Sequence, residues 1–351
     1  MNEKTNKKGF GAWFRDNWKN NALFSTGIAL IVMVILQTLA LGFDYASFGE
    51  WFGAWINNWM NILRNNSSVG IIALGMTFVI ITGGIDLSSG SVLALTAMVA
   101  ASLAQEPGYA RAVYPALGGI SVFWPILAGL AIGAVTGLIN GSLISYTAIP
   151  PFIATLGMML LTKGLALVIS GTKPIYFENE ALPAISLDSL IGEVIPALPI
   201  PNGVLIMFVL AIAATFILNK TILGTYTFAL GSNEEAVRLS GVNTDRWKII
   251  VYSFAGGICG IAGLLMASRL NSAQPALGQG YELDAIAAVV IGGTSLSGGS
   301  GTILGTIIGA FIMSVLTNGL RIMSVAQEWQ IIVTGVIIIL AVYADNMRKK
   351  K

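Results

Sequence analysis

The chain has 351 residues, of which 55% are hydrophobic and only 10% are charged, and its mean hydropathy is +0.78. A soluble domain carries about 25% charged residues, so this composition excludes an ordinary soluble protein and predicts an integral membrane protein. A net charge of +2 without a basic face argues against nucleic-acid binding. The lack of histidine removes the commonest general base and metal ligand. The single cysteine, Cys259, lies in an apolar run and is typical of a core residue.

The first apolar run, 23–41, follows a tail (1–22) that contains five basic residues. This run is longer than the roughly 7–15 apolar residues of a cleavable signal, so we expect a retained first span. A spanning helix needs about 20 mostly apolar residues. Ten stretches meet or approach this length: 23–41, 67–83, 90–105, 122–146, 151–170, 203–219, 249–268, 281–296, 301–322 and 328–345.

We therefore expect an all-α polytopic membrane protein with about ten transmembrane helices in a single domain, 23–346, followed by a basic tail, 347–351. Thirteen of the 19 Lys and Arg residues lie in the two tails or in and beside the 220–248 loop. Ten spans place all three regions on one side, which the positive-inside rule makes cytoplasmic. The 171–202 loop falls outside, and its charges are mostly acidic.

The external region 42–66 is aromatic, with Trp51, Trp55 and Trp59 four residues apart. This spacing favours an interfacial helix that lies on the membrane with one aromatic stripe. A stacking platform for a ligand is the alternative.

Two pairs of segments resemble each other within the chain. Residues 83–91 and 292–300 match at six of nine positions, which suggests two parallel halves, a known plan for transporters. Ile132-Gly-Ala with Asn140-Gly141 resembles Ile308-Gly-Ala with Asn318-Gly319 more weakly, on spans expected to run in opposite directions. Recurrent glycine at close helix contacts would explain both similarities without a repeat.

The polar stretch Gly231-Ser-Asn-Glu-Glu-Ala-Val-Arg-Leu-Ser-Gly241 is the most informative one in the chain. It is typical of one short capped helix in the cytoplasmic 220–248 loop. Ser232 and Glu235 have the spacing of a capping box, and Gly241 suits the left-handed stop. Its small apolar surface, Ala236, Val237 and Leu239, predicts a contact for a soluble partner.

The chemistry of an enzyme is missing. The chain has no phosphate-binding loop of the Gly-x-x-x-x-Gly-Lys-Ser/Thr type, no cluster of Cys and His for a metal and no Ser-His pair. We expect no catalytic residues, no cofactor and no metal. Any ATP hydrolysis is then expected in a separate subunit.

Five polar residues at membrane depth are candidates for a solute pathway. Asp86 is either a helix cap for the next span or a direct contact for substrate. Glu282 and Asp284 open the eighth span and are either caps or contacts for a hydroxylated solute. Asn140 and Asn318 bond either across helices or to solute hydroxyls. Lys163, which interrupts the fifth span, is typical of a side chain that reaches back to the interface.

With these motifs the chain resembles the membrane permease of a bacterial ABC importer for monosaccharides, of the ribose, galactose, xylose and inositol group. The resemblance covers roughly 60–346. It rests on five stretches: Gly84-Ile-Asp-Leu-Ser-Ser-Gly90, Pro151-Phe-Ile-Ala-Thr-Leu-Gly157, Gly231 to Gly241, Ser272-Ala-Gln-Pro275, and Gly280-Tyr-Glu-Leu-Asp-Ala-Ile-Ala-Ala-Val-Val-Ile-Gly-Gly-Thr-Ser-Leu296.

The resemblance implies a fold similar to that of the vitamin B12-type importers, in the bacterial inner membrane with both termini cytoplasmic. It implies a dimer with a second permease, two cytoplasmic ATPase subunits and an extracytoplasmic sugar-binding protein. The 231–241 segment would be the coupling helix that docks on the ATPase. The residues that take this role are Asn233, Glu234, Glu235, Ala236, Leu239, Ser240 and Gly241.

ATP-driven uptake of a neutral monosaccharide or polyol is the function that the sequence favours. The remaining expected partner is membrane lipid, which surrounds the spans. A stand-alone secondary carrier or facilitator is the main alternative, although such a carrier usually has several acids within its spans. An exporter with the same helix and a purely structural subunit are further alternatives.

Overall fold

The computed structural model describes residues 22–195 and 199–349, so most of the tail 1–22 and the last two residues lie outside the described part. The described chain is all-α apart from a two-residue antiparallel pairing of β1 (Ile175–Tyr176) with β2 (Ser272–Ala273). The expected fold class is thereby confirmed. The main helices are α2 (Ala22–Leu41), α3 (Phe48–Ile81), α4 (Ser89–Leu103), α5 (Phe123–Tyr146), α6 (Pro151–Ser170), α9 (Asn202–Lys220), α10 (Ile222–Leu239), α11 (Thr244–Leu270), α12 (Tyr281–Ile291), α13 (Ile303–Ile322) and α14 (Gln327–Lys349). Three short elements, η1 (Pro115–Leu117), α7 (Ala181–Leu187) and α8 (Leu190–Val194), lie in the connections.

Helices occupy all ten predicted places, but in the described residues seven are long and apolar enough to cross a membrane. The prediction of a full span over 281–296 is wrong. Helix α12 has 11 residues, about 16 Å at 1.5 Å per residue, which is half of a hydrocarbon core of about 30 Å. The chain then runs through 292–302 without a helix, because paired glycines at 292–293 and 298–299 interrupt it. Helix α4, with 15 residues, is also short.

The prediction of a separate interfacial helix within 42–66 is also wrong, because α3 continues without a break from Phe48 into the predicted second span. The aromatic residues hold α3 against the end of α2. The indole N–H of Trp51 donates to the Gly42 carbonyl at 3.0 Å, and that of Trp55 donates to the Thr38 hydroxyl at 3.2 Å. These contacts favour a packing role over a ligand platform.

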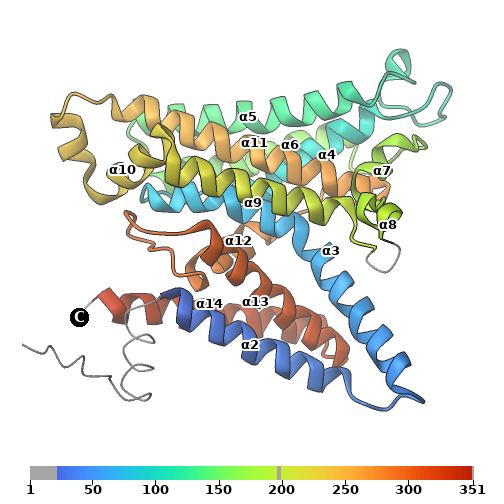
Figure 1. The fold of residues 1–351 in the computed structure, drawn as a ribbon. Helices are drawn as coiled ribbons and strands as arrows, with labels where there is room; N and C mark the ends of the chain where they lie inside the picture. Colours follow the sequence, from blue (N-terminus) through green and yellow to red (C-terminus); the bar gives the residue numbers. More distant parts are fainter. Residues whose placement is uncertain (1–21, 196–198, 350–351) are drawn as a thin grey trace, which may run out of the picture.

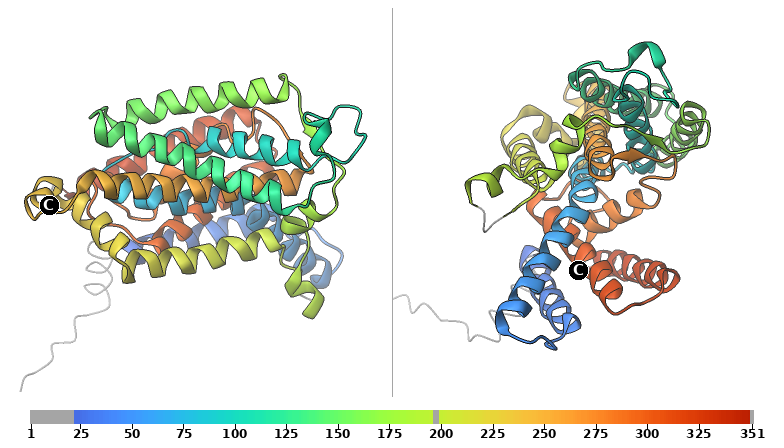
Figure 2. Two further views of the ribbon diagram at one scale, coloured as in Figure 1. Left: turned by 90° about the horizontal axis from the view of Figure 1, so that it is seen from above. Right: turned by 90° about the vertical axis from the view of Figure 1, so that its right-hand side faces the viewer.

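The helices form two groups that α3 connects. Helices α4, α5, α6, α9 and α11 lie in the upper group of Figure 1, α2, α13 and α14 lie in the lower group, and α12 lies between them. The view from the right in Figure 2 shows the lower group apart from the upper one. Helix α10 lies at one end of the bundle, where α2 begins and α14 ends, and α7 and α8 lie at the opposite end (Figure 1). This arrangement agrees with the prediction that the 220–248 and 171–202 loops lie on opposite sides.

Local capping sets several helix boundaries. Pro151 occupies the first turn of α6, where a missing N–H costs nothing, and Gly171 ends the helix in the left-handed region with φ +55°. The Asn243 side chain accepts from the N–H of Arg246 to start α11, and Asn271 ends it with φ +50°. The Thr302 hydroxyl accepts from the N–H of Gly305 and starts α13 after the break.

Glycine allows α5 and α11 to pack backbone against backbone. A Cβ added at Gly133 would lie 2.3 Å from the Gly256 carbonyl oxygen, and one at Gly256 would lie 2.2 Å from the Gly133 oxygen. Small residues permit such approaches between membrane helices, where lipid provides no hydrophobic drive for association. Because Gly133 belongs to the weaker of the two internal similarities, this packing explains that similarity without a repeat.

Replacement of Gly133 by alanine should force α5 and α11 apart and destabilise the folded protein by about 1–3 kcal/mol, the usual cost of overpacking. We expect a lower level in the membrane and a lower melting temperature in detergent. Gly164→Ala is the matched control, since a Cβ at Gly164 meets nothing within 4 Å. Equal stability of the two variants would contradict the proposed packing constraint.

Candidate functional site

Helix α10 contains a break at Asn233, whose backbone has φ −164° and ψ 94°. The Asn233 side-chain oxygen accepts a hydrogen bond from the N–H of Ala236 at 3.0 Å, which makes Asn233 the cap of a second, short helix. The predicted capping box of Ser232 and Glu235 is therefore wrong. Ser232 still belongs to the preceding helix, where its hydroxyl donates to the Phe228 carbonyl at 2.9 Å.

The short helix (residues 234–239) ends as predicted. Gly241 has φ +83°, and its N–H donates to the Arg238 carbonyl at 3.0 Å. The predicted loop 220–248 is thus mostly helical, because α10 starts at Ile222, two residues after α9 ends at Lys220.

The residues predicted for coupling divide between two faces of the short helix. Leu239 is 81% exposed, and Glu235, Ala236 and Ser240 are exposed with it. Glu234 points back toward the bundle and pairs with Lys248 of α11 at 2.5 Å. Glu235 pairs instead with Arg238 on the helix surface, and this carboxylate raises the pKa of the Arg238 guanidinium. The outward face therefore presents a large apolar side chain among polar ones at the polar end of the bundle.

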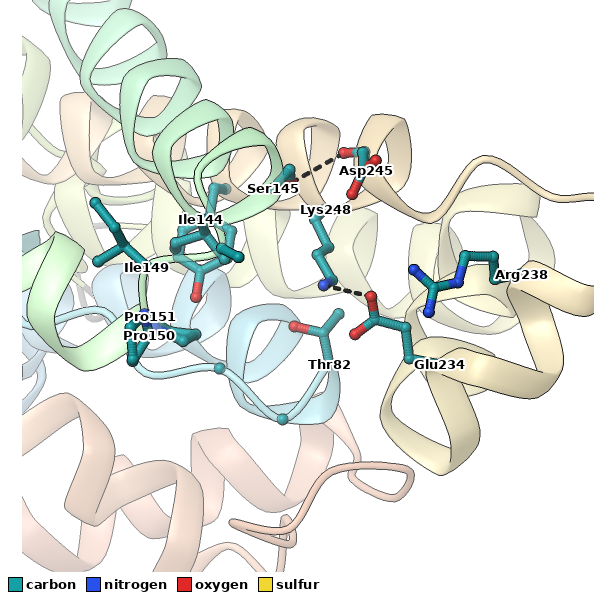
Figure 3. A pocket seen from close by; sticks show the side chains of 14 residues that line it. Thr82, Ile144, Ser145, Ile149, Pro150, Pro151, Glu234, Arg238, Asp245 and Lys248 are labelled. Carbon is teal, nitrogen blue, oxygen red and sulfur yellow. Dashed lines mark hydrogen bonds and ion pairs between the residues drawn. The ribbon is translucent and has the colours of Figure 1, made fainter.

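A polar cavity of about 420 Å³, the inner cavity, lies beside the short helix. Figure 3 shows Glu234 and Arg238 on one side of it, Lys248 above, and the linker of α5 and α6 with Pro150 and Pro151 on the other side. Thr82 and the glycines that follow α3 complete its wall. No sequence pattern pointed to Lys248 or Tyr252 as residues of this cavity.

Asp86 and Asn140 lie together in a buried hydrogen-bonded chain. The Asp86 carboxylate accepts from the N–H of Ser88 at 2.8 Å and from its hydroxyl at 2.6 Å, and the Asn140 amide donates to the same hydroxyl at 2.9 Å. Asp86 is 3% exposed and Asn140 is 1% exposed. Asp86 closes an Asx turn two residues before the cap position of α4, which Ser88 occupies. The hydrogen bonds through the Ser88 hydroxyl join this turn to Asn140 of α5.

Asp284 and Asn318 meet in a second cavity of about 210 Å³, the outer cavity, although they are 34 positions apart. Tyr281, Arg269 and Arg321 also line it. The Asn318 amide donates to the Asn58 side-chain oxygen of α3 at 2.7 Å. Within the described residues Asp284 has no ion-pair partner. The outer cavity is thus lined by an unpaired carboxylate together with an amide and an aromatic ring.

Glu282 lies apart from both cavities. Its carboxylate accepts from the N–H of Gly280 at 3.2 Å, at the start of α12. A Cβ added at Gly90 would lie 2.2 Å from this carboxylate, so Glu282 packs against the first turn of α4. Lys163 is exposed on α6.

Comparison with known proteins identifies the family of this chain. Residues 58–342 match the family described as branched-chain amino acid transport system / permease component. The chain belongs to this family. It is 44% identical over 328 residues to a ribose import permease protein of Escherichia coli (strain K12), covering 92% of this chain and 93% of that one.

Two further relatives are sugar permeases. A galactose/methyl galactoside import permease protein of Escherichia coli (strain K12) is 37% identical over 350 residues, 98% of this chain and 97% of that one. A fructose import permease protein of Rhizobium meliloti is 33% identical over 327 residues, 92% of this chain and 86% of that one. No solved structure matches the chain significantly. Like these permeases, the chain is a multi-pass membrane protein and a transport component.

The Asn233 cap gives a local prediction. Asn233→Ala should destabilise the short helix by about 1 kcal/mol, which increases hydrogen exchange of the 236–240 amides about fivefold. Ser232→Ala is the control, since that hydroxyl bonds only within the preceding turn. If Ser232→Ala has the larger effect, the assignment of the cap is wrong.

Proposed function

We propose that this chain is the permease subunit of an ATP-binding cassette importer and forms the path of a neutral monosaccharide or polyol across the bacterial inner membrane. The 44% identity to a ribose import permease over most of both chains carries the proposal. In it, separate cytoplasmic subunits hydrolyse ATP, an extracytoplasmic binding protein delivers the solute, and a second permease completes a dimer. Both termini are cytoplasmic, and the fold resembles that of vitamin B12-type importers.

The exposed face of the short helix supports an ATPase partner. Leu239, Ala236, Glu235 and Ser240 can enter a groove, and a desolvated leucine is the kind of anchor that carries docking energy. In this proposal Asn233 and Gly241 shape the helix and Glu234 fixes it to α11, so these three predicted coupling residues act behind the docking face.

The outer cavity supports a solute contact. Asp284 and Asn318 offer acceptors and donors for hydroxyl groups, and Tyr281 offers an aromatic face. Asp86, Asn140 and Glu282 hold the start of α4 and of α12, so we propose that these three shape the pathway and do not contact the solute directly.

Leu239→Asp should abolish capture of the ATPase subunits, because it places a charge in the centre of the docking face. The measurement is co-purification of the ATPase from membranes with the affinity-tagged permease. Leu239→Met, which keeps the apolar contact, should retain capture. If the aspartate variant reaches normal membrane levels and still captures the ATPase fully, the short helix is not the docking site.

Uptake by the reconstituted importer tests the solute class. With ATP and the binding protein present, labelled ribose or galactose should accumulate and labelled leucine should not. Asp284→Asn should lower the maximal rate of uptake about tenfold, the effect of losing one hydrogen bond to a charged group, because the binding protein sets the half-saturating sugar concentration. The control, Glu193→Gln on the outer loop, should change nothing.

Two outcomes would favour other functions. Accumulation of leucine in place of sugar would assign the chain to amino-acid import, which the family description also names. Sugar uptake that persists without ATP and collapses with a proton ionophore would favour a stand-alone carrier.

A further inference from the structure

Gly231, two residues before the break in α10, lies in direct backbone contact with the end of α3. A Cβ added at Gly231 would lie 1.7 Å from the Ile81 carbonyl oxygen and 2.5 Å from the Gly299 nitrogen. Real Cβ contacts do not approach so closely, so only glycine fits between these two segments. The preceding part of α10 therefore meets α3 without an intervening side chain.

A third backbone segment closes the same contact. The N–H of Gly299 donates to the Ile81 carbonyl at 2.9 Å. Gly298 and Gly299 have φ +82° and +74°, and a Cβ at Gly298 would lie 2.9 Å from the carbonyl oxygens of both Gly231 and Ile81. We call Ile81, Gly231, Gly298 and Gly299 the glycine junction.

The glycine junction connects α10 to two long helices of the core. Ile81 is the last residue of α3, and Gly299 comes three residues before Thr302, the cap of α13. The hydroxyls of Thr77 in α3 and Thr306 in α13 share a hydrogen bond of 2.7 Å. A displacement of the junction must therefore reach α3 and α13 together.

On the side that faces α11, the short helix is held by a side-chain ion pair and not by backbone contact. It faces the inner cavity, and its side-chain link to α11 is the ion pair of Glu234 and Lys248, whose side chains are 42% and 19% exposed. An ion pair this close to solvent is screened and yields easily. The contact with α3 and the 292–302 segment is therefore a close backbone contact, whereas the link of the short helix itself to α11 is a partly exposed ion pair that adjoins open space.

We propose that the glycine junction is the pivot through which movement of the short helix reaches the membrane helices, with Gly231 as its positioning residue. This inference rests on the proposed function of the short helix. When an ATPase moves that helix, the junction stays closed and turns as one unit, α3 and α13 follow, and the inner cavity changes volume as the ion pair adjusts.

Gly231→Ala tests the pivot. We expect a lower membrane level, as at any overpacked contact, but normal ATPase capture per permease molecule. Sugar uptake per molecule should be at least about tenfold lower, because the added methyl group separates α10 from Ile81. ATP hydrolysis should continue but lose its stimulation by the loaded binding protein. Lys248→Met should lower uptake by less than about threefold, and Gly157→Ala, where a Cβ meets nothing within 4 Å, should be neutral.

Stimulated hydrolysis and uptake near the unchanged protein's values in Gly231→Ala would overturn the proposal. So would a larger loss of uptake in Lys248→Met than in Gly231→Ala. Failure of the unchanged protein to capture an ATPase or to take up sugar would instead refute the proposed function, so the two failures are distinguishable.

A cross-link keeps the test decisive if Gly231→Ala fails to assemble. The Thr77 and Thr306 hydroxyl oxygens lie 2.7 Å apart, so a disulfide between Thr77→Cys and Thr306→Cys in a Cys259→Ala background would join α3 to α13. Oxidation should leave uptake within about twofold of the reduced protein, since the joined segments already move together. A block of uptake that reductant reverses would show that α3 and α13 separate during transport and would overturn the proposal.

Discussion

Backbone-to-backbone contact between helices, at distances that only glycine permits, is the constraint on which this structure depends. Between helices in a membrane, the stabilisation comes from close packing and hydrogen bonds, because lipid is as apolar as the side chains it would release. The contact of Gly133 with Gly256 joins α5 to α11. A Cβ at Gly309 would lie 2.0 Å from the Ala288 carbonyl, so α12 and α13 approach in the same way. The glycine junction uses this device at the polar end.

The sequence predicted the fold class and most helix positions because apolar length is a local property. It failed where tertiary contacts decide. The apolar run 281–296 contains Gly292 and Gly293, and a hydropathy window does not register that the helix stops there. Helix α3 was divided at its polar middle, although the polar residues of that part pack on neighbouring helices: Asn58 bonds to Asn318, and the Arg269 guanidinium donates to the Arg64 carbonyl at 3.0 Å.

The candidate site was partly predictable for the same reason. The end of the short helix at Gly241 follows from a local glycine rule, but its start does not, since Ser232 and Asn233 are both good caps and only the continuation of α10 through Ser232 decides between them. Contacts between distant residues carry no local signal. Neither the pairing of Glu234 with Lys248 nor the meeting of Asp284 with Asn318 could be predicted without the fold.

The distribution of buried polar groups bears on the source of energy. Asp86, the acid nearest the break between α3 and α4, already accepts two hydrogen bonds from Ser88 and is almost fully buried, so it is held in place and not free to exchange a cation with water. Glu282 is bonded at the start of α12. Ion coupling would need acids that gain and lose a proton or sodium ion along the path. Of these acids and Asp284, only Asp284 is unpaired within the described residues, and one such acid is fewer than a coupled carrier usually has. The exposed short helix and the glycine junction behind it therefore offer the more direct route for energy to reach the spans.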